Sequence, residues 1–360
     1  MKIAIILGTR PEIIKMSPII RELEKRNSNY FILHTGQHYS YNLDQVFFDQ
    51  LKLPRPKYNL RVGSGTHAEE TGKMLIGIER ILLKEKPDII LVEGDTNTVL
   101  AGALAATKLN ILVGHVEAGL RSFDREMPEE INRTLTDHIS DFLFAPTEKA
   151  KQNLLKEGIP SEKIFVTGNT IVDAVYQNLK LSNIQFNTLN DLDINSDDYF
   201  LVTVHRQENV DNKERFQGIL DGLKLVHEEL NIPIIFPIHP RTKKRMKRFN
   251  LKPEGLTLID PIDYLSFLQL ESKAKLILTD SGGVQEEACI LRVPCVTLRY
   301  NTERPETLEV GANVLAGTDP NEIVEKVKFM LNKKRDWNNP FGDGKAGKRI
   351  VKILLGCKNG

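Results

Sequence analysis

The stretch that decides the fold runs from residue 89 to residue 122 and reads IILVEGDTNTVLAGALAATKLNILVGHVEAGLRS. Its two short apolar runs, at residues 89–93 and 111–115, have the length and composition of buried strands. Residues 98–108, between them, carry a helical pattern. A strand, a helix and a second strand in this order predict a βαβ unit with two parallel strands.

The same alternation of apolar runs and helical patterns continues toward both ends of the chain. Further strand-like runs lie at residues 3–7, 31–34, 142–145, 164–167, 200–204, 234–238, 256–259, 276–279 and 295–298. Further helical patterns lie at residues 12–26, 129–140 and 148–157. Such alternation predicts parallel sheets with helices on both faces, which is the doubly wound α/β class.

A polar segment at residues 183–198 interrupts the alternation, and a length of 360 residues favours two domains. We therefore expect an N-terminal Rossmann-like domain over residues 1–182 and a C-terminal one over residues 199–340. A helix within residues 341–360 is expected to pack back on the first domain. The carboxyl ends of the strands of both domains would then face a cleft, where α/β sheets bind ligands.

The composition is that of an ordinary globular protein without a dominant charge. Forty-nine basic and 48 acidic residues give a net charge of +1, which does not favour nucleic acid as a partner. No apolar segment approaches the roughly 20 residues that span a membrane, and the first apolar run is too short for a signal peptide. Three scattered cysteines fit a reducing compartment and argue against structural zinc. We therefore expect a cytoplasmic protein without metal, membrane or nucleic-acid partners.

Three carboxylates lie at predicted strand ends or helix starts in the first domain. Glu117 follows one strand, between His115 and Arg121, and the alternative to a functional role is an ion pair that joins strand to loop. Asp95 follows the preceding strand, where an aspartate also serves as a helix N-cap. Glu129 opens a helix, a place where acidic residues complement the helix dipole. We interpret all three as candidates for acid–base chemistry.

The first strand is followed by GTRPEIIK at residues 8–15, which places cations at the start of a helix. Pro11 suits the first helical turn, whose free N–H groups and dipole favour an anion. Arg10 lies at this helix start, and Lys15 lies one turn further on the same face. An anionic ligand fits this pattern better than a charged surface loop does.

The second domain carries a pattern typical of nucleotide binding. His205 ends its first strand, and Ser281-Gly282-Gly283 opens the helix after its fourth strand. Glycines at a helix start let backbone amides approach phosphate oxygens. Glu287, four residues after the second glycine, would repel a diphosphate, so ribose hydroxyls suit it better. The pattern therefore predicts a nucleoside diphosphate ligand.

Two common cofactor motifs are absent from the sequence. No G-x-G-x-x-G follows the first strand, and no G-x-x-x-x-G-K-[ST] is present, so neither a nicotinamide cofactor nor a P-loop is predicted. No group of His and Asp residues has metal-ligand spacing. We therefore expect no cofactor.

Taken in order, these motifs resemble those of the non-hydrolysing UDP-N-acetylglucosamine 2-epimerases. The matching motifs are G-T-R-P-E at 8–12 with Lys15, E-G-D-T at 93–96, G-H-V-E-A-G-L-R-S at 114–122, P-E-E-x-N-R at 128–133, H-R-x-E-N at 205–209 and S-G-G-x-Q-E-E at 281–287. They cover about residues 1–310. The resemblance implies a glycosyltransferase-B architecture, a homodimer, and an isomerase of polysaccharide biosynthesis that interconverts UDP-GlcNAc and UDP-ManNAc.

The resemblance also implies roles for individual residues. The catalytic positions would be Asp95, Glu117, Glu129 and His205, and the substrate-binding positions Arg10, Lys15, Phe267, Ser281, Gly282, Gly283, Glu287 and Arg304. Phe267 would lie against the uracil, whereas Ile262 stands where some relatives carry a polar uracil contact. Gln37 and His38 match a loop that binds a second UDP-GlcNAc as activator in bacterial members, although residues 39–41 diverge from it.

An epimerase without NAD needs another way to acidify the proton at C2. Cleavage of the C1–O bond to UDP creates positive charge at C1, so we expect elimination to 2-acetamidoglucal and UDP, followed by re-addition. Asp95 and Glu117 would transfer protons with support from Glu129, and the sequence does not distinguish which is the base. Three alternatives stay open: a glycosyltransferase of the same fold, a hydrolysing epimerase, and a nucleotide-sugar sensor without chemistry.

Overall fold

The computed structural model describes residues 1–36, 41–192, 194 and 198–356, and the chain divides into two compact units. Unit 1 comprises Met1–Gln177 and Phe341–Gly360, and unit 2 comprises Asn178–Pro340. The division falls inside helix α7 (Thr170–Gln185), five residues before the boundary that the sequence suggested. Each unit has its own parallel sheet and its own core, so we describe each by itself.

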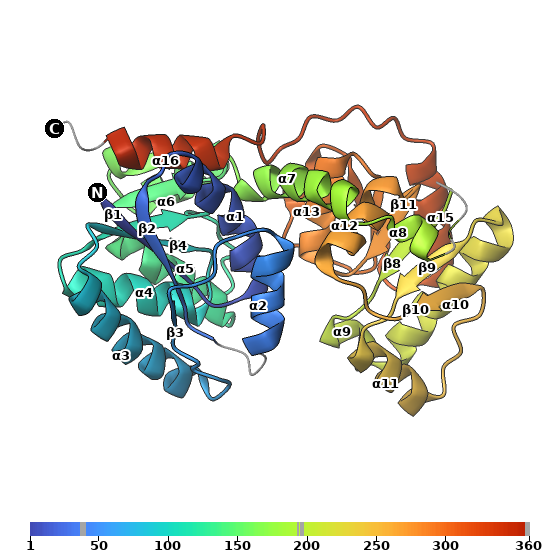
Figure 1. Ribbon diagram of the computed structural model, residues 1–360. Coiled ribbons are helices and arrows are strands. Elements are labelled where there is room, and N and C mark those ends of the chain that lie inside the picture. The colour runs from blue at the N-terminus through green and yellow to red at the C-terminus, as the bar shows by residue number, and fades with distance from the viewer. Residues whose placement is uncertain (37–40, 193, 195–197, 357–360) are drawn as a thin grey trace. The chain divides into compact units, whose positions relative to one another are not determined.

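Unit 1 is built on a seven-stranded parallel sheet in the order β3-β2-β1-β4-β5-β6-β7 (Figure 1). The strands are β1 (Lys2–Leu7), β2 (Asn29–His34), β3 (Tyr58–Asn59), β4 (Ile89–Glu93), β5 (Leu112–Val116), β6 (Phe142–Ala145) and β7 (Ile164–Val166). The strand order reverses between β1 and β4, which pair in parallel through Ile3 and Ile89. Such a switch point is where open α/β sheets bind ligands.

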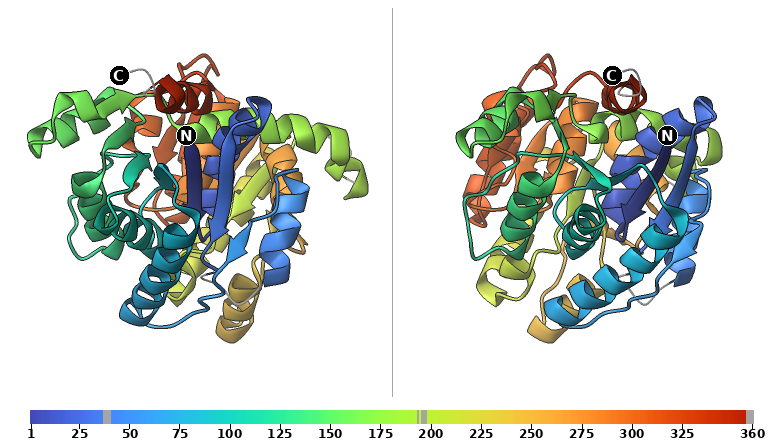
Figure 2. Two further views of the ribbon diagram at one scale, coloured as in Figure 1. Left: turned by 60° about the vertical axis from the view of Figure 1, so that its left-hand side comes forward. Right: turned by 90° about the vertical axis from the view of Figure 1, so that its left-hand side faces the viewer.

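Helices cover both faces of this sheet (Figure 2). They are α1 (Arg10–Lys25), α2 (Tyr41–Gln50), α3 (His67–Glu85), α4 (Asn97–Lys108), α5 (Pro128–Ile139), α6 (Glu148–Lys156), the short 3₁₀ helix Ser161–Lys163, and α16 (Ala346–Gly356). The C-terminal helix α16 lies beside α1, where Gly347 approaches the backbone of Pro18 so closely that a Cβ would meet it at 3.0 Å. Asp173 of α7 accepts hydrogen bonds from the first two amides of α16, at 3.0 and 3.1 Å.

Unit 2 repeats the doubly wound pattern with six parallel strands in the order β10-β9-β8-β11-β12-β13. The strands are β8 (Phe200–Thr203), β9 (Ile234–Pro237), β10 (Leu256–Ile259), β11 (Leu276–Thr279), β12 (Cys295–Thr297) and β13 (Asn313–Leu315). The helices are α8 (Thr188–Asp191), α9 (Gln207–Val210), α10 (Lys213–Leu230), α11 (Pro240–Phe249), α12 (Tyr264–Lys273), α13 (Gly282–Leu291), α14 (Pro305–Glu309) and α15 (Pro320–Leu331). The order reverses between β8 and β11, so this unit has its own switch point.

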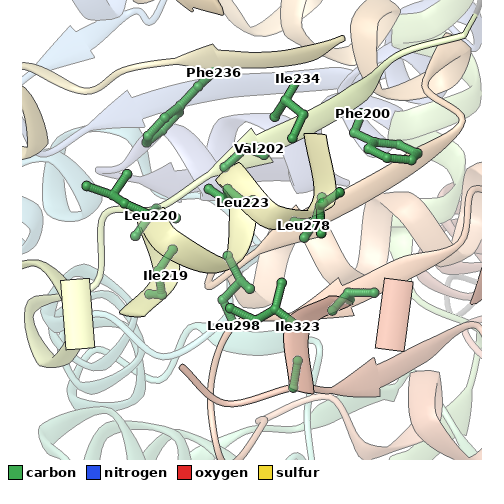
Figure 3. Close-up of a cluster of buried hydrophobic side chains, with 14 of the residues drawn as sticks. Phe200, Val202, Ile219, Leu220, Leu223, Ile234, Phe236, Leu278, Leu298 and Ile323 are labelled. Carbon is green, nitrogen blue, oxygen red and sulfur yellow. The ribbon is translucent and has the colours of Figure 1, made fainter. Parts of the chain in front are cut away.

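The core of unit 2 shows why the apolar runs become central strands. Phe200 and Val202 of β8 and Leu278 of β11 belong to the same buried cluster as Leu220 and Leu223 of α10 (Figure 3). All five side chains are at most 2% exposed. Helices on both faces of a parallel sheet bury every residue of its central strands, which explains continuous apolar runs in place of alternation.

The α/β class and the parallel, doubly wound topology are confirmed in both units. Two short strands, β3 and β13, were not anticipated, because two or three residues carry no periodic signal. The polar segment at residues 183–198 was expected only to separate the two domains, but part of it packs on a core. Within it, Leu189, Leu192 and Ile194 pack on the core of unit 2, at a spacing that the surrounding Asn and Asp residues obscured. Within the described residues, no helix is long and apolar enough to cross a membrane.

Candidate active site

At the switch point of unit 1, Lys15 of α1 contacts Glu117, the residue that follows β5. The Lys15 ammonium lies 2.7 and 2.6 Å from the two carboxylate oxygens of Glu117, and Asn169 donates a hydrogen bond of 3.0 Å to the second of them. The side chains of Lys15 and Glu117 are 13% and 7% exposed. The structure therefore brings together two residues, 102 positions apart, that the sequence had placed in one site.

The backbone of Glu117 is itself unusual. Its φ of +68° lies in the left-handed region, which residues with a Cβ adopt rarely. Gly119, two residues later, also has a positive φ, and a Cβ there would meet the carbonyl oxygen of Ala150 at 2.4 Å. A strained non-glycine residue that carries a buried carboxylate is typical of a functional site.

Asp95 belongs to the same end of the sheet, in the loop between β4 and α4. Its carboxylate forms an ion pair with Arg133 of α5, and the side chain of Asn132 donates to the Asp95 carbonyl oxygen at 3.0 Å. The side chain of Asp95 is 34% exposed, so it is accessible to a ligand. The N-cap of α4 is Thr96, so Asp95 is not the cap that the alternative interpretation required.

Two further carboxyls, Glu12 and Glu93, lie in this cluster, and both are 2% exposed. Glu12 accepts hydrogen bonds from the backbone amides of Gly8 and Thr9 and from the hydroxyl of Thr96. Burial raises the pKa of Glu12 to about 7, against the opposing effect of these hydrogen bonds. Burial also raises the pKa of Glu93 well above its usual value, and Lys15 offsets only part of this effect. Both residues lie within the motifs at 8–12 and 93–96, but the sequence predicted no role for either.

His115 and Arg121, the neighbours of Glu117 in sequence, point elsewhere. Asp137 of α5 lies 2.6 Å from Nδ1 of His115 and 2.7 Å from the Arg121 guanidinium. The other ring nitrogen of His115 lies 2.8 Å from the carbonyl oxygen of Gly94, so both nitrogens of the ring face acceptors. All three side chains are at most 2% exposed. His115 and Arg121 therefore have a structural role, since they connect this segment to α5 and, through His115, to the loop at Gly94. Glu117 is the charged residue of the segment 114–122 that belongs to the Lys15 cluster.

Two other predicted residues of unit 1 are separate from this network. Arg10 and Glu129 are exposed residues of the first turns of α1 and α5, and neither has an ion pair or hydrogen bond to another described residue. The neighbour of Glu129, Glu130, is buried and accepts hydrogen bonds from Ser122 and Phe123. Both Arg10 and Glu129 are thus free to contact a ligand, whereas Glu130 anchors a loop.

The switch point of unit 2 is organised by Asp280, which follows β11 and is fully buried. Its carboxylate accepts backbone hydrogen bonds from His205 at 3.0 and 3.1 Å and from Arg206 at 2.9 Å, together with a side-chain bond from Asn209. This fixes the turn after β8 and leaves the His205 ring 48% exposed. Partial burial lowers the pKa of His205, and Asp280 opposes the shift only in part.

Ser281-Gly282-Gly283 forms the start of α13, as predicted, with Ser281 as the N-cap. A Cβ on Gly282 would lie 3.5 Å from the Glu303 carboxylate and 4.0 Å from side-chain atoms of Arg206 and Arg304, and one on Gly283 would meet only the Ser281 hydroxyl at 3.9 Å. Nothing in the unit therefore requires glycine at either position. Arg206 pairs with Glu303 at 3.5 Å and Arg304 with Glu286 at 2.9 Å, so the uncrowded helix start has both cations and carboxylates around it. The free amides of the helix start suit a diphosphate, and the two arginines could turn from these carboxylates to it.

Glu287 lies further along α13 and is 8% exposed. The hydroxyl of Tyr264 donates to its carboxylate at 3.0 Å, and a second carboxyl, Glu271, is fully buried beside it. Burial and the charge of Glu287 raise the pKa of Glu271 well above its usual range. Phe267, on the same helix as Tyr264, packs partly buried against the unit 2 core. Tyr264 and Glu271 had no motif signal and were missed.

The structure says less about the expected activator loop and about metal binding. Gln37 and His38, the residues of the expected activator loop, lie outside the described residues. Within the part of the chain that the structure describes, no group of His, Cys, Asp and Glu is arranged to hold a metal ion. Cys289 and Cys295 are buried free thiols.

Each unit is Rossmann-like. Unit 1 carries a carboxylate cluster held by a lysine, and unit 2 carries a helix start suited to a diphosphate. These features are typical of a nucleotide-sugar enzyme with the glycosyltransferase-B type of fold. The sequence profile of a family described as UDP-N-acetylglucosamine 2-epimerase matches residues 21–355. The chain belongs to this family, and membership supports epimerase activity on UDP-GlcNAc.

Individual relatives agree with this assignment. The chain is 65% identical to a UDP-N-acetylglucosamine 2-epimerase of Methanocaldococcus jannaschii, over 98% of this chain and 99% of the relative. A crystal structure of UDP-GlcNAc 2-epimerase from that organism, in complex with UDP-GlcNAc and UDP, matches with a TM-score of 0.88 at 64% identity and covers 99% of both chains. A Pseudomonas aeruginosa UDP-2,3-diacetamido-2,3-dideoxy-D-glucuronate 2-epimerase is 43% identical over 98% of this chain and 99% of its own.

Proposed function

We propose that this protein interconverts UDP-GlcNAc and UDP-ManNAc by eliminating UDP to form 2-acetamidoglucal and then adding UDP back. The observation that carries the proposal is Glu117, a buried carboxylate in a strained backbone conformation, held by Lys15 at the switch point of unit 1. A carboxylate kept ionised and immobile in this way is suited to accept a proton from carbon.

Unit 2 would bind the departing UDP. The first amides of α13 would provide positive charge for the diphosphate, together with Arg206 and Arg304, which pair with Glu303 and Glu286 in this structure. His205 at the same switch point is accessible and would donate a hydrogen bond to the leaving group. Glu287, oriented by Tyr264, would accept hydrogen bonds from the ribose hydroxyls, and Phe267 would lie against the uracil.

Unit 1 would carry out the proton transfers. In the elimination, one carboxylate takes the C2 proton while the C1–O bond breaks and UDP leaves with the bonding electrons. The glucal then takes a proton at C2 on its opposite face, and UDP adds to C1 to give the epimer. Asp95 and Glu117 would perform these transfers, because both lie at the ends of adjacent strands β4 and β5. Arg10, Lys15 and Glu129 would contact or stabilise the reacting sugar.

The test is proton NMR of UDP-GlcNAc with the protein in deuterium oxide. The proposal requires formation of UDP-ManNAc with deuterium at C2, because the proton removed is exchanged for one from solvent. Epimer that retains protium at C2 after many turnovers, or release of UDP with free sugar, would overturn it. UDP-2,3-diacetamido-2,3-dideoxy-D-glucuronate serves as the competing substrate, since a relative acts on it.

The alternatives make different products. A glycosyltransferase would need an acceptor, a hydrolysing epimerase would release free ManNAc, and a sensor would bind UDP-GlcNAc without turnover. The glycosyltransferase and the sensor would leave Glu117 and Asp95 without a proton-transfer role, whereas the hydrolysing epimerase is distinguished by its product alone. We also propose a cytoplasmic homodimer, which light scattering of the purified chain would test by its mass in solution.

A further inference from the structure

Glu93 is a buried carboxyl that the proposed reaction does not use. It is the last residue of β4, and its side chain belongs to the cluster because the Lys15 ammonium contacts both Glu93 and Glu117. Its Oε1 lies 3.4 Å from the Lys15 ammonium and has no hydrogen-bond partner, and the residue is 2% exposed. A buried carboxyl with this geometry needs an explanation.

Lys15 is held by Glu117 and not by Glu93. Its ammonium lies within 2.7 Å of both oxygens of Glu117 but 3.4 Å from the nearer oxygen of Glu93. An ionised buried carboxylate would draw a neighbouring ammonium into hydrogen-bond distance, because the attraction is strong where water is excluded. The longer contact therefore indicates that Glu93 carries a proton and Glu117 carries the charge.

The other charges around Glu93 favour the same state. Glu12 from α1, Asp95 from the loop after β4 and Glu117 from the loop after β5 are all acidic, and Lys15 is the one cation among the groups that act on Glu93 in the described structure. These three acidic neighbours and burial together raise the pKa of Glu93, whereas Lys15 lowers it. Burial and the acidic neighbours thus favour the neutral form of Glu93, in agreement with its longer contact to Lys15.

We propose that Glu93 is a positioning residue whose neutral form reserves Lys15 for Glu117 and keeps a second negative charge out of the substrate site. This inference rests on the proposed function, in which an anionic nucleotide sugar binds beside the cluster. Ionisation of Glu93 at higher pH would make Lys15 the shared partner of two carboxylates. The contact of Lys15 with Glu117 would weaken, so kcat/KM for the substrate would fall.

The full-length protein tests this through the pH dependence of kcat/KM for UDP-GlcNAc, from neutral to alkaline pH. The wild type should lose about tenfold or more in kcat/KM on the alkaline side, because an ionised Glu93 would compete with Glu117 for Lys15. Glu93→Gln copies the shape of the neutral acid and does not ionise. It should stay within about threefold of wild type at neutral pH and lose the alkaline fall.

Glu12→Gln is the matched control, because it removes a second buried carboxyl with a raised pKa from the same cluster. The alkaline fall should persist in it. Glu93→Met, a neutral side chain of similar length, repeats the test if Gln does not fold, with loss of the alkaline fall expected again. The proposal is overturned if the alkaline fall in kcat/KM persists without Glu93 or is removed by Glu12→Gln. It is also overturned if the wild-type profile is flat. A tenfold loss at neutral pH in a folded Glu93→Gln would overturn it too.

Infrared spectroscopy tests the proton itself and does not depend on turnover. The wild type at neutral pH should show the carbonyl stretch of protonated carboxyls, and Glu93→Gln should remove one component of it. An unchanged band would show that Glu93 is ionised and would overturn the inference. Deuterium incorporation at C2 is measured on the same samples, so failure of the epimerase proposal is recognised separately.

Discussion

The Lys15 ammonium contacts both carboxylate oxygens of Glu117, at 2.7 and 2.6 Å, across the point where the strand order of unit 1 reverses. Lys15 comes from the helix after β1, and Glu117 follows β5, with β4 between these strands. Because the contact uses both oxygens, it fixes the plane of the carboxylate as well as its charge. A proton acceptor held in this way presents one defined direction to a ligand.

Lys15→Met should lower kcat/KM by about two orders of magnitude, because it removes the charge that holds Glu117 ionised and in place. It should also destabilise the fold, since a buried carboxylate loses its partner, typically at about 3–5 kcal/mol. Initial rates and urea unfolding measure the two effects. Lys25→Met, at the exposed last turn of the same helix, is the control and should change neither. Equal rates in the two variants would remove Lys15 from the site.

Asp95→Asn should lower kcat by about 10²-fold or more with little change in the melting temperature, because its carboxylate is the proposed proton-transfer group and is partly exposed. Arg133→Met should lower kcat by a smaller factor, since it frees the Asp95 side chain and removes one partner of Glu130 but leaves both carboxylates in place. Steady-state kinetics separates kcat from KM in each. Arg80→Met, on the exposed face of α3, controls for loss of an arginine. If Arg133→Met had a lower kcat than Asp95→Asn, Arg133 and not Asp95 would be the more important residue for the reaction.

Asp137→Asn should destabilise unit 1 by about 3–5 kcal/mol, because it removes the buried carboxylate that the Arg121 guanidinium and the His115 ring share. Burial alone would raise the pKa of Asp137, but these partners outweigh it and the pKa is lowered. The stabilisation is therefore present above the pKa of the unfolded chain and is lost as pH falls through the lower folded value. Urea unfolding at several pH values measures it.

The control for that variant is Asp49→Asn, which breaks an exposed ion pair with Arg55. Exposed pairs contribute at most about 1 kcal/mol, so its stability should stay near that of the wild type. If Asp137→Asn were no more destabilising than Asp49→Asn, the buried cluster would not hold the loop that carries Glu117.

The predictable part of the site lies at strand ends. Glu117, Asp95 and His205 each follow a continuous apolar run, and parallel topology brings such positions to the same edge of a sheet. Lys15 was predictable because Pro11 marks the start of its helix. The same rule suggested the helix start at Gly282, which the structure has.

The remaining residues depend on packing that no local pattern encodes. Asn169, which binds Glu117, follows the strand farthest from β1 in its sheet and is preceded by no special motif. Asp137 contacts His115 across 22 residues because of the register of one helix on the sheet. The sequence pattern placed His115 and Arg121 beside Glu117, but the backbone turn at Glu117 sends them to a different partner.

Glu287→Gln should weaken UDP binding about tenfold or more, because the amide replaces a charged acceptor of the ribose hydroxyls. The wild type should bind 2′-deoxy-UDP more weakly than UDP, and the variant should lose most of this preference. Titration calorimetry with both ligands measures the difference. Glu309→Gln, at the end of α14, provides a glutamate variant outside the proposed binding residues. An unchanged preference in Glu287→Gln would mean that Glu287 does not contact the ribose.

Glu12→Gln should change how stability depends on pH. The folded pKa of Glu12 is raised by burial to about 7 from 4.5, so the folded protein keeps a proton that the unfolded chain has already released. The wild type therefore loses stability as pH rises from about 4.5 to 7, and the shift corresponds to roughly 3 kcal/mol. Glutamine binds no proton, so the variant should gain stability relative to wild type over that interval and hold the gain above it.

Urea unfolding across that pH interval measures the difference in free energy of unfolding between the two proteins. Glu79→Gln on the exposed face of α3 is the control, because an exposed carboxyl titrates alike in the folded and unfolded chains. Parallel curves for wild type and Glu12→Gln would mean that Glu12 is ionised when folded. Its hydrogen bonds from Gly8, Thr9 and Thr96 would then outweigh its burial, and the negative charge around Lys15 would be larger by one.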